Sequence, residues 1–150
     1  MELQKNIEAF SRLGERLRAV SQGGTDTETE RVIVTASSAN PWFTKDNIYG
    51  ALGALGQALT EKDLEKWMAV YKVRTGSVRQ KRIGVISAGN IPAVGFHDFL
   101  CVLMSGNIYE GKNSSDDALL LPHIASMLKK IEHSFEERIF LLKKFLFRMR

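Results

Sequence analysis

The sequence lacks several features, and each absence excludes a class of protein. A single cysteine, Cys101, excludes an internal disulfide and is compatible with a reducing compartment. No repeat or low-complexity tract is present, and hydrophobic residues make up 44% of the chain, which is not a disordered composition. No apolar run approaches the ~20 residues that a membrane span needs. The N-terminus is charged and has no apolar core, so we expect no signal peptide and predict a cytoplasmic protein.

Signals for nucleic acid or metal binding are also missing. The net charge is +4 and the sequence pI is about 9.3, but the basic residues are spread along the chain. This charge permits an anionic ligand without demanding nucleic acid. There is no zinc-finger spacing, no RNA-binding motif, and no metal-ligand spacing among the three histidines. We expect no nucleic acid partner and no metal. A length of 150 residues suits one domain or part of a larger one.

The most informative pattern lies in residues 82–115. An apolar run with β-branched residues at 83–86 predicts a buried strand. Small, turn-prone residues at 87–90 end this strand. Pro92 then starts a helix, where its missing N–H and fixed φ cost nothing. The helix is apolar nearly all round as far as Met104, which is typical of a buried helix.

A second predicted strand at 108–110 follows this helix, and a polar turn at 112–115 comes next. Strand, helix and strand form a βαβ unit, which builds a parallel sheet. In open parallel sheets, ligands bind beyond the carboxyl ends of the strands. Asn90 and Lys112 lie in the turns at those two ends. If the strands are neighbours, an amide and an ammonium project into one crevice.

Four motifs occur in the same order as in a known enzyme family. They are Asn-Pro-Trp-Phe-Thr at 40–44, Leu-Glu-Lys-Trp at 64–67, VISAGNIPAVGFHDFLCVLMSGN at 85–107 and Lys-Asn-Ser-Ser at 112–115. Together they resemble acyl-CoA reductases of the branch related to the fatty-acid reductase of luminous bacteria, which belongs to the aldehyde dehydrogenase superfamily. The resemblance covers about residues 29–142, and a full enzyme of this family is much longer than this chain.

The resemblance implies an α/β fold in two parts. An N-terminal helical region, 1–80, is followed at 81–150 by the first βαβ unit of a Rossmann-type cofactor domain with C-terminal helices. The implied activity is reduction of an acyl-CoA or acyl-protein thioester to an aldehyde with NADPH or NADH. The catalytic cysteine of the family lies far downstream, so we expect this chain to be a truncated part that is inactive alone. An oligomer is compatible with this assignment.

The resemblance also assigns roles to four residues. Asn90 matches the superfamily's oxyanion-hole asparagine, whose amide N–H stabilises charge on the thioester oxygen. The alternative is an asparagine chosen for the turn. Lys112 matches the lysine that contacts the adenosine ribose, and Ser114 and Ser115 can add hydroxyl donors. The alternative is a solvated lysine, and Asn113 stands where many superfamily members have proline.

Other conspicuous residues have structural explanations. His97 and Asp98 are neighbours in the predicted buried helix and do not face each other, so we expect structural hydrogen bonds instead of a catalytic pair. Cys101 has apolar neighbours in the same helix and is predicted to be an inert core thiol. Trp42 and Trp67 are predicted to pack in the core.

Periodic apolar residues predict an amphipathic helix at 1–20. Thr27 with Glu30 matches a capping box, and we predict a short helix there, although residues 32–35 favour a strand.

Thr44 and Thr60 are predicted to cap two further helices. Gly50, Gly53 and Gly56 line one face of the first of these, which predicts close approach of another helix.

An apolar stripe at 119–131 predicts a helix with a kink or a fresh start at Pro122. Residues 135–150 predict a last amphipathic helix with a basic face. The alternative function is a small, mainly helical interaction module without enzymatic activity. Such a module would bind a protein partner through the glycine-lined face or through the last helix.

Overall fold

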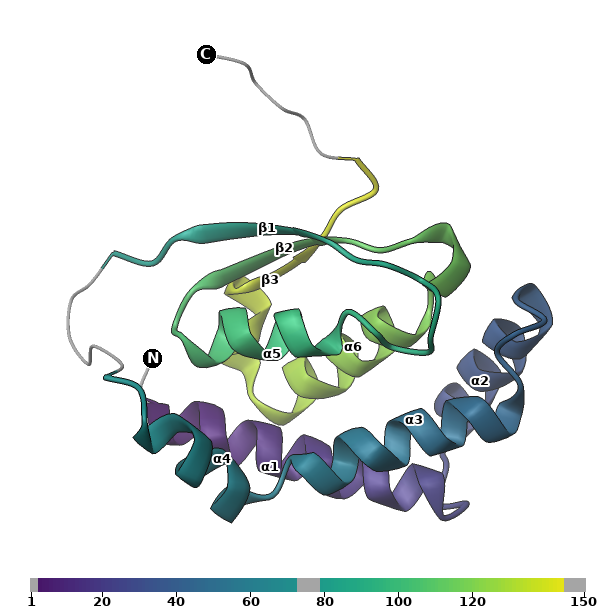
Figure 1. The fold of residues 1–150 in the computed structure, drawn as a ribbon, viewed down its shortest axis with the longest axis horizontal. Coiled ribbons are helices and arrows are strands. Elements are labelled where there is room, and N and C mark those ends of the chain that lie inside the picture. The colour runs from purple at the N-terminus through teal and green to yellow at the C-terminus, as the bar shows by residue number, and fades with distance from the viewer. Residues whose placement is uncertain (1–2, 73–78, 145–150) are drawn as a thin grey trace.

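The computed structural model describes residues 3–72 and 79–144 as a small sheet with helices on one of its faces (Figure 1). The first elements are the helices α1 (Leu3–Ser21), α2 (Thr27–Ala39), α3 (Lys45–Ala58) and α4 (Glu61–Ala69). The next are β1 (Arg82–Ile86), α5 (Phe96–Met104), β2 (Ile108–Lys112), the 3-10 turn η1 (Ser115–Asp117), α6 (Leu120–Ile131), the 3-10 turn η2 (His133–Glu137) and β3 (Ile139–Leu141). Within these ranges, no helix is long and apolar enough to span a membrane.

The three strands form a parallel sheet in the order β1-β2-β3, which confirms the mixed α/β class and the pairing of β1 with β2. Both α5 and α6 lie on the same face of the sheet (Figure 1). No described element covers the other face. The strand predicted at 83–86 is therefore present as part of β1, but the prediction that it is buried is wrong. Side chains in β1 alternate between exposed and half-buried, because only one face of the strand packs against helices.

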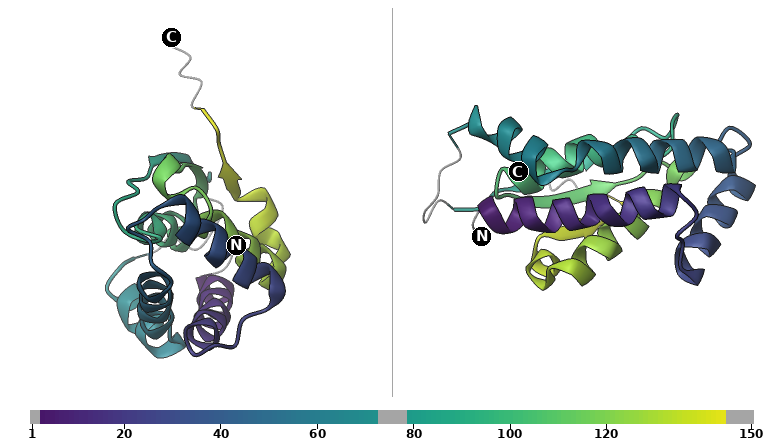
Figure 2. Two further views of the ribbon diagram at one scale, coloured as in Figure 1. Left: turned by 90° about the vertical axis from the view of Figure 1, so that its right-hand side faces the viewer. Right: turned by 90° about the horizontal axis from the view of Figure 1, so that it is seen from below.

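The middle layer of helices, α5 and α6, lies between the sheet and the layer that contains α1, α3 and α4 (Figures 1 and 2). Phe10 of α1 joins these layers. Its ring is fully buried and makes edge-to-face contacts with Phe96, Phe99 and Phe135, at centroid separations of 6.4, 6.3 and 5.9 Å. Aromatic contacts of this kind stabilise a core beyond the apolar area that they bury.

Helices α1 and α3 pack closely side by side (Figure 2). A Cβ atom at Gly56 would lie 2.8 Å from the backbone nitrogen of Arg18 and 2.9 Å from the carbonyl oxygen of Gly14. A Cβ atom at Gly53 would lie 3.0 Å from a side-chain carbon of α1, whereas one at Gly50 would meet nothing. The predicted close approach of another helix is therefore confirmed for Gly53 and Gly56, but not for Gly50.

Hydrogen bonds at the helix starts follow the sequence signals. The hydroxyl oxygens of Thr44 and Thr60 each accept a hydrogen bond from the N–H three residues later, at 3.1 Å in both cases. The helix expected near Thr27 is present, but its cap is Asp26, which accepts from the Thr29 N–H at 2.7 Å. A fresh start near Pro122 is also confirmed. Because α6 begins at Leu120, the proline falls in the first helical turn, where its missing N–H costs little.

The predicted last helix, 135–150, is wrong over residues 135–144, and residues 145–150 lie outside the described ranges. In place of a helix, η2 leads into β3, which pairs in parallel with β2.

Arg138, between these two elements, explains the difference. Its buried guanidinium donates to the carbonyl oxygens of Leu103 at 2.7 Å and Asn107 at 3.0 Å, and to the Asn6 side chain at 3.2 Å. These bonds hold the arginine at the C-terminal end of α5, where carbonyl groups carry partial negative charge. This anchoring and the β2–β3 pairing outweigh the local helical periodicity.

Candidate functional site

The connection from β1 to α5, residues 87–95, carries Asn90. It is not helical, so the prediction that a helix starts at Pro92 is wrong by about one turn. Ala93 has a φ of 56°, in the left-handed region that a right-handed helix excludes. The buried Asp117 holds this conformation, because its carboxylate oxygen Oδ2 accepts the Ala93 N–H at 2.6 Å. Strained L-residues of this kind are concentrated at functional sites.

The turn after β2 packs directly against the turn after β1. The Ser87 N–H donates to the carbonyl oxygen of Lys112 at 3.0 Å. Gly89 then lies so close to Ser114 that a Cβ atom at Gly89 would be 2.5 Å from the serine hydroxyl oxygen. Ser114 in turn caps η1 by accepting the Asp116 N–H at 3.2 Å. The two turns at the carboxyl edge of the sheet therefore form one packed unit.

A third segment completes this edge. The side chain of Asn40 donates to the carbonyl oxygen of Asp116 at 3.1 Å and accepts the Trp42 N–H at 3.0 Å. The segment between α2 and α3 is thereby fixed beside the turn that carries Asn90. Between them lies an open hollow of about 490 Å³. Its lining residues come from these three segments and are Ala39, Asn40, Pro41, Trp42, Gly89, Asn90 and Asp116.

Trp42 lines this hollow, which the sequence analysis did not predict. Its side chain is 82% exposed, so the prediction that it packs in the core is wrong, whereas the neighbouring Phe43 is 1% exposed. Phe43 occupies the core position before the Thr44 cap, and its neighbour must point outward. The sequence contains a signal for an exposed aromatic side chain here. Trp42 and Phe43 are adjacent, and only one of the two can pack into the core at such a turn.

Polar groups of the hollow remain free to meet a ligand. Among the described residues, none forms a hydrogen bond or ion pair with the Asn90 amide, the Asp116 carboxylate or the Trp42 indole. Asp116 gives the hollow negative character. The hollow therefore suits an uncharged or cationic group, such as a carbonyl or an aromatic ring, better than a phosphate.

The other predicted residues lie close by but outside the lining. Lys112 pairs in register with Ile86, and it follows the buried Gly111 in β2, so its side chain lies on the uncovered face of the sheet. Its ammonium makes no ion pair with any residue in the described ranges. Ser114 is half-buried against Gly89, and Ser115 is exposed in η1. The structure thus brings the four residues to one edge of the sheet, with Asn90 in the hollow and Lys112 on the adjacent face.

His97, Asp98 and Cys101 differ from their predictions. His97 and Asp98 are exposed on α5, and Cys101 is partly exposed, because the helix buries only its opposite side. The Cys101 sulfur lies 3.6 Å from the His97 nitrogen Nε2. Burial, and secondarily the charge of Asp98, raise the pKa of the Cys101 thiol, which disfavours the reactive thiolate. Neither His97 nor Cys101 lines the hollow.

No group of three potential metal ligands comes together within residues 3–72 and 79–144. Comparisons of the chain with models of protein families, with curated proteins and with solved structures give no match.

Proposed function

We propose that this chain forms the acyl-binding and nucleotide-binding part of an NAD(P)H-dependent acyl-thioester reductase that produces an aldehyde. The proposal combines the motif resemblance with one geometric observation. The Asn-Pro-Trp-Phe-Thr segment and the Asn90 turn, which are far apart in the sequence, meet around a single hollow at the carboxyl edge of parallel strands. That edge is where ligands bind in sheets of this type.

Asn90 is suited to the acyl-transfer step. When a thiolate attacks a thioester, the carbon–sulfur bond to the leaving thiol breaks and negative charge passes through the carbonyl oxygen. A fixed amide N–H donor stabilises that charge, and removing such a donor costs ~2.7–4 kcal/mol of transition-state stabilisation. The Asp116 carboxylate in the same hollow acts against this stabilisation. The free Asn90 side chain sits on a turn held by Asp117 and Ser114, so little reorganisation is needed.

The residues at the end of β2 fit a nucleotide in part. Lys112 offers a free ammonium and Ser115 an exposed hydroxyl, both able to donate to ribose oxygens or to a 2′-phosphate. The Ser114 hydroxyl oxygen already accepts the Asp116 N–H, so this serine contributes mainly to the shape of the turn. When bound, the reduced nicotinamide supplies the hydride that converts the acyl-enzyme to the aldehyde.

Nucleotide titration tests the binding part of the proposal. Calorimetry with NADPH and with NADH is expected to show saturable binding that Lys112→Ala weakens about tenfold or more, through loss of a charge-assisted hydrogen bond. Lys62→Ala is the matched control, because Lys62 is an exposed lysine on α4, away from the sheet. Equal affinities of Lys112→Ala and the parent would remove Lys112 from the site, and absence of binding by the parent would contradict nucleotide binding.

We also propose that this chain alone does not reduce a thioester. Its single thiol, Cys101, lies outside the hollow that holds Asn90, and burial disfavours its thiolate. Mixing the chain with an acyl-CoA and NADPH is expected to leave the nicotinamide absorbance at the level of a protein-free control. Oxidation of NADPH that disappears in Cys101→Ser would show that Cys101 is the nucleophile.

The alternative, a non-enzymatic interaction module, has less support. Its first candidate surface was the face lined by Gly50, Gly53 and Gly56, of which Gly53 and Gly56 pack against α1 within the chain and Gly50 does not. Its second was a C-terminal amphipathic helix, which is absent from residues 135–144.

A further inference from the structure

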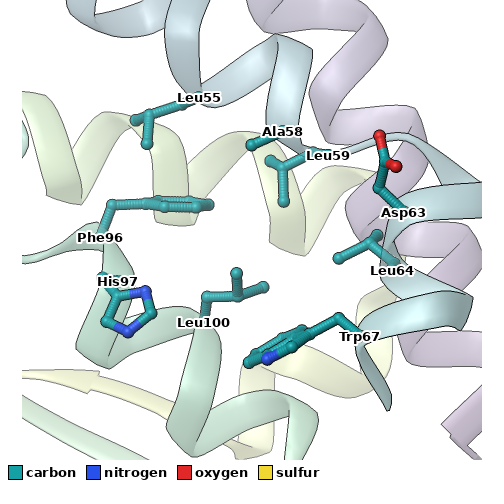
Figure 3. Close-up of a pocket in the computed structure, with 9 residues that line it drawn as sticks. All are labelled: Leu55, Ala58, Leu59, Asp63, Leu64, Trp67, Phe96, His97 and Leu100. Atoms are coloured by element: carbon teal, nitrogen blue, oxygen red, sulfur yellow. The ribbon is translucent and has the colours of Figure 1, made fainter. Parts of the chain in front are cut away.

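A second concavity, separate from the hollow at Asn90, lies between the helical layers. It has a volume of about 420 Å³ and is bounded by the end of α3, by α4 and by the first turns of α5 (Figure 3). This volume is within the range of small-molecule sites. The two concavities share no lining residue, so this one is not an extension of the proposed acyl-transfer site.

The walls of this concavity are almost entirely hydrocarbon. Leu55, Leu59, Leu64, Trp67, Phe96 and Leu100 contribute side chains from all three helices and face a common open space (Figure 3). Such walls offer no set of hydrogen-bond donors or acceptors that would position a polar ligand. They favour a ligand that gains free energy by removing its own apolar surface from water.

The apolar surface continues from Trp67 past the end of α4. Trp67 makes an edge-to-face contact with Tyr71, at a centroid separation of 6.2 Å. Tyr71 and the neighbouring Val70 are 57% and 75% exposed. A ligand longer than the concavity would therefore keep contact with apolar side chains beyond its mouth.

The lining includes one carboxylate. Asp63 lies at one side of the concavity, near the start of α4, where its carboxylate oxygen Oδ2 accepts the Thr60 hydroxyl at 2.6 Å. On the other side, His97 of α5 presents an exposed imidazole. A carboxylate beside an apolar cavity repels an anionic head group and is indifferent or attractive to a neutral or cationic one.

We propose that this concavity binds the hydrocarbon chain of a lipid-like molecule whose head group is neutral or cationic. The inference rests on the apolar walls, the apolar surface next to Trp67 and the charge of Asp63. It does not depend on the reductase proposal, because it uses different residues and predicts a ligand that need not be a thioester.

Three probes with the same eight-carbon chain and different heads test the proposal: 1-octanol, n-octylamine and octanoate. Trp67 lines the site, so its fluorescence in a Trp42→Phe background reports occupancy. Titrations at pH 8 are expected to show saturable binding of octanol and octylamine, with octanoate weaker by about fivefold through repulsion by Asp63. Asp63→Asn is expected to remove most of that difference between heads.

Two alanine substitutions on α3 provide a matched pair. Ala58 lines the concavity, and Ala54, one turn earlier on the same helix, does not, although both side chains are exposed. Ala58→Phe fills the space and is expected to weaken all three probes about tenfold or more, while Ala54→Phe binds them like the parent. Thermal unfolding of both variants checks that they fold.

Two results would overturn the assignment of the site, and a third would overturn its head-group preference. One is parental affinity in a folded Ala58→Phe variant, which would place the probes elsewhere. The other is a fluorescence change that fails to saturate with every probe. Octanoate binding as tightly as octanol would overturn the assigned head-group preference. Nucleotide binding by Ala58→Phe, measured in parallel, separates failure of this site from failure of the reductase proposal.

Discussion

Asp117 shows how one buried side chain determines the shape of the turn that carries Asn90. Its carboxylate accepts the N–H of Ala93, whose left-handed φ costs ~1–2 kcal/mol for an L-residue other than glycine. Burial raises the pKa of the Asp117 carboxyl group, against the smaller opposite effects of the Ala93 and Leu120 N–H groups. The charged carboxylate therefore carries a desolvation cost at neutral pH in addition to the strain of the turn that it holds.

Two substitutions at Asp117 separate the effect of its negative charge from the effect of the hydrogen bond that it accepts. Asp117→Ala is expected to lower the free energy of unfolding by ~1–3 kcal/mol, because the buried Ala93 N–H loses its acceptor. Asp117→Asn keeps one carbonyl-type oxygen for that bond and is expected to cost less. Urea denaturation at pH 7 measures both variants. A larger loss for the asparagine variant would mean that the negative charge, and not the acceptor, holds the turn.

His123 provides a test of pH dependence at the residue scale. Its nitrogen Nε2 lies 2.8 Å from the hydroxyl oxygen of Thr29, and burial lowers its pKa below the ordinary 6.5, against smaller raising effects of Glu28 and Asp26. A histidine with a lowered folded-state pKa binds its proton more weakly than in the unfolded chain. The unfolded chain therefore gains stability relative to the folded one as the imidazole becomes protonated.

The free energy of unfolding is accordingly expected to fall as the pH is lowered through about 6.5 to the folded-state pKa of His123, and to show no further loss from this group below that. His123→Gln retains a partner for Thr29 without a titrating group and should lack this component. Denaturant titrations of both proteins between pH 8 and pH 5 provide the difference curve. A flat difference would show that His123 titrates alike in the folded and unfolded states.

The sequence predicted a residue's role correctly where the partners of that residue are close to it in the chain. The caps at Thr44 and Thr60 involve partners three residues away, and their sequence signals were correct. The conformation of Ala93 is set by Asp117, which lies on another turn and leaves no local signature. For the same reason, the sequence could place Asn90 at a strand end but not the Trp42 indole beside it.

At the scale of elements, the contact between α1 and α3 depends on glycine at some positions and not at others. Gly56 lies against backbone atoms of α1, which cannot move aside as a flexible side chain would. Gly50 is on the same helix, is exposed, and has open space where a Cβ atom would lie. The same substitution at these two positions should therefore have opposite effects.

Gly56→Ala is expected to destabilise the protein by ~1–3 kcal/mol through overpacking against α1. Gly50→Ala should stabilise it by ~0.5–1 kcal/mol, because alanine restricts the unfolded chain and favours the helix. Melting temperatures and urea midpoints of the two variants test this directly. Stabilisation by both substitutions would mean that α1 and α3 are farther apart in solution than in the structure.

The failed prediction at the C-terminal end is a case of tertiary contacts overriding periodicity. Ile139 and Leu142 are spaced as on one face of a helix, yet residues 139–141 form β3. Pairing with β2 satisfies the backbone there, and Arg138 binds the carbonyl oxygen of Leu103 in α5 and that of Asn107 just after it. Helical propensity is a weak preference, and contacts this distant in sequence cannot be seen in a local pattern.

At the scale of the whole molecule, the sheet has two unlike faces. Parallel sheets are usually covered on both faces, but here the described helices all lie on one. On the outer face, Arg82 pairs with Glu110, and its guanidinium lies 4.9 Å from the centre of the Phe140 ring. This charged and aromatic arrangement partly shields the outer face from water, while Ile86 at the edge strand remains 68% exposed.

The isoleucines on the two faces allow a matched comparison. Ile139 points toward the helices and is 2% exposed, so Ile139→Ala is expected to lower the free energy of unfolding by ~2–5 kcal/mol. Ile86→Ala removes the same atoms from the exposed face and should cost no more than ~1 kcal/mol, mostly from strand propensity.

Both variants are measured by urea denaturation at two protein concentrations, because a bound second copy makes stability depend on concentration. If the two substitutions cost the same, another polypeptide covers the outer face in solution. A cost at Ile86 that rises with protein concentration would identify that polypeptide as a second copy of this chain, and a concentration-independent, small cost is the result that the structure predicts.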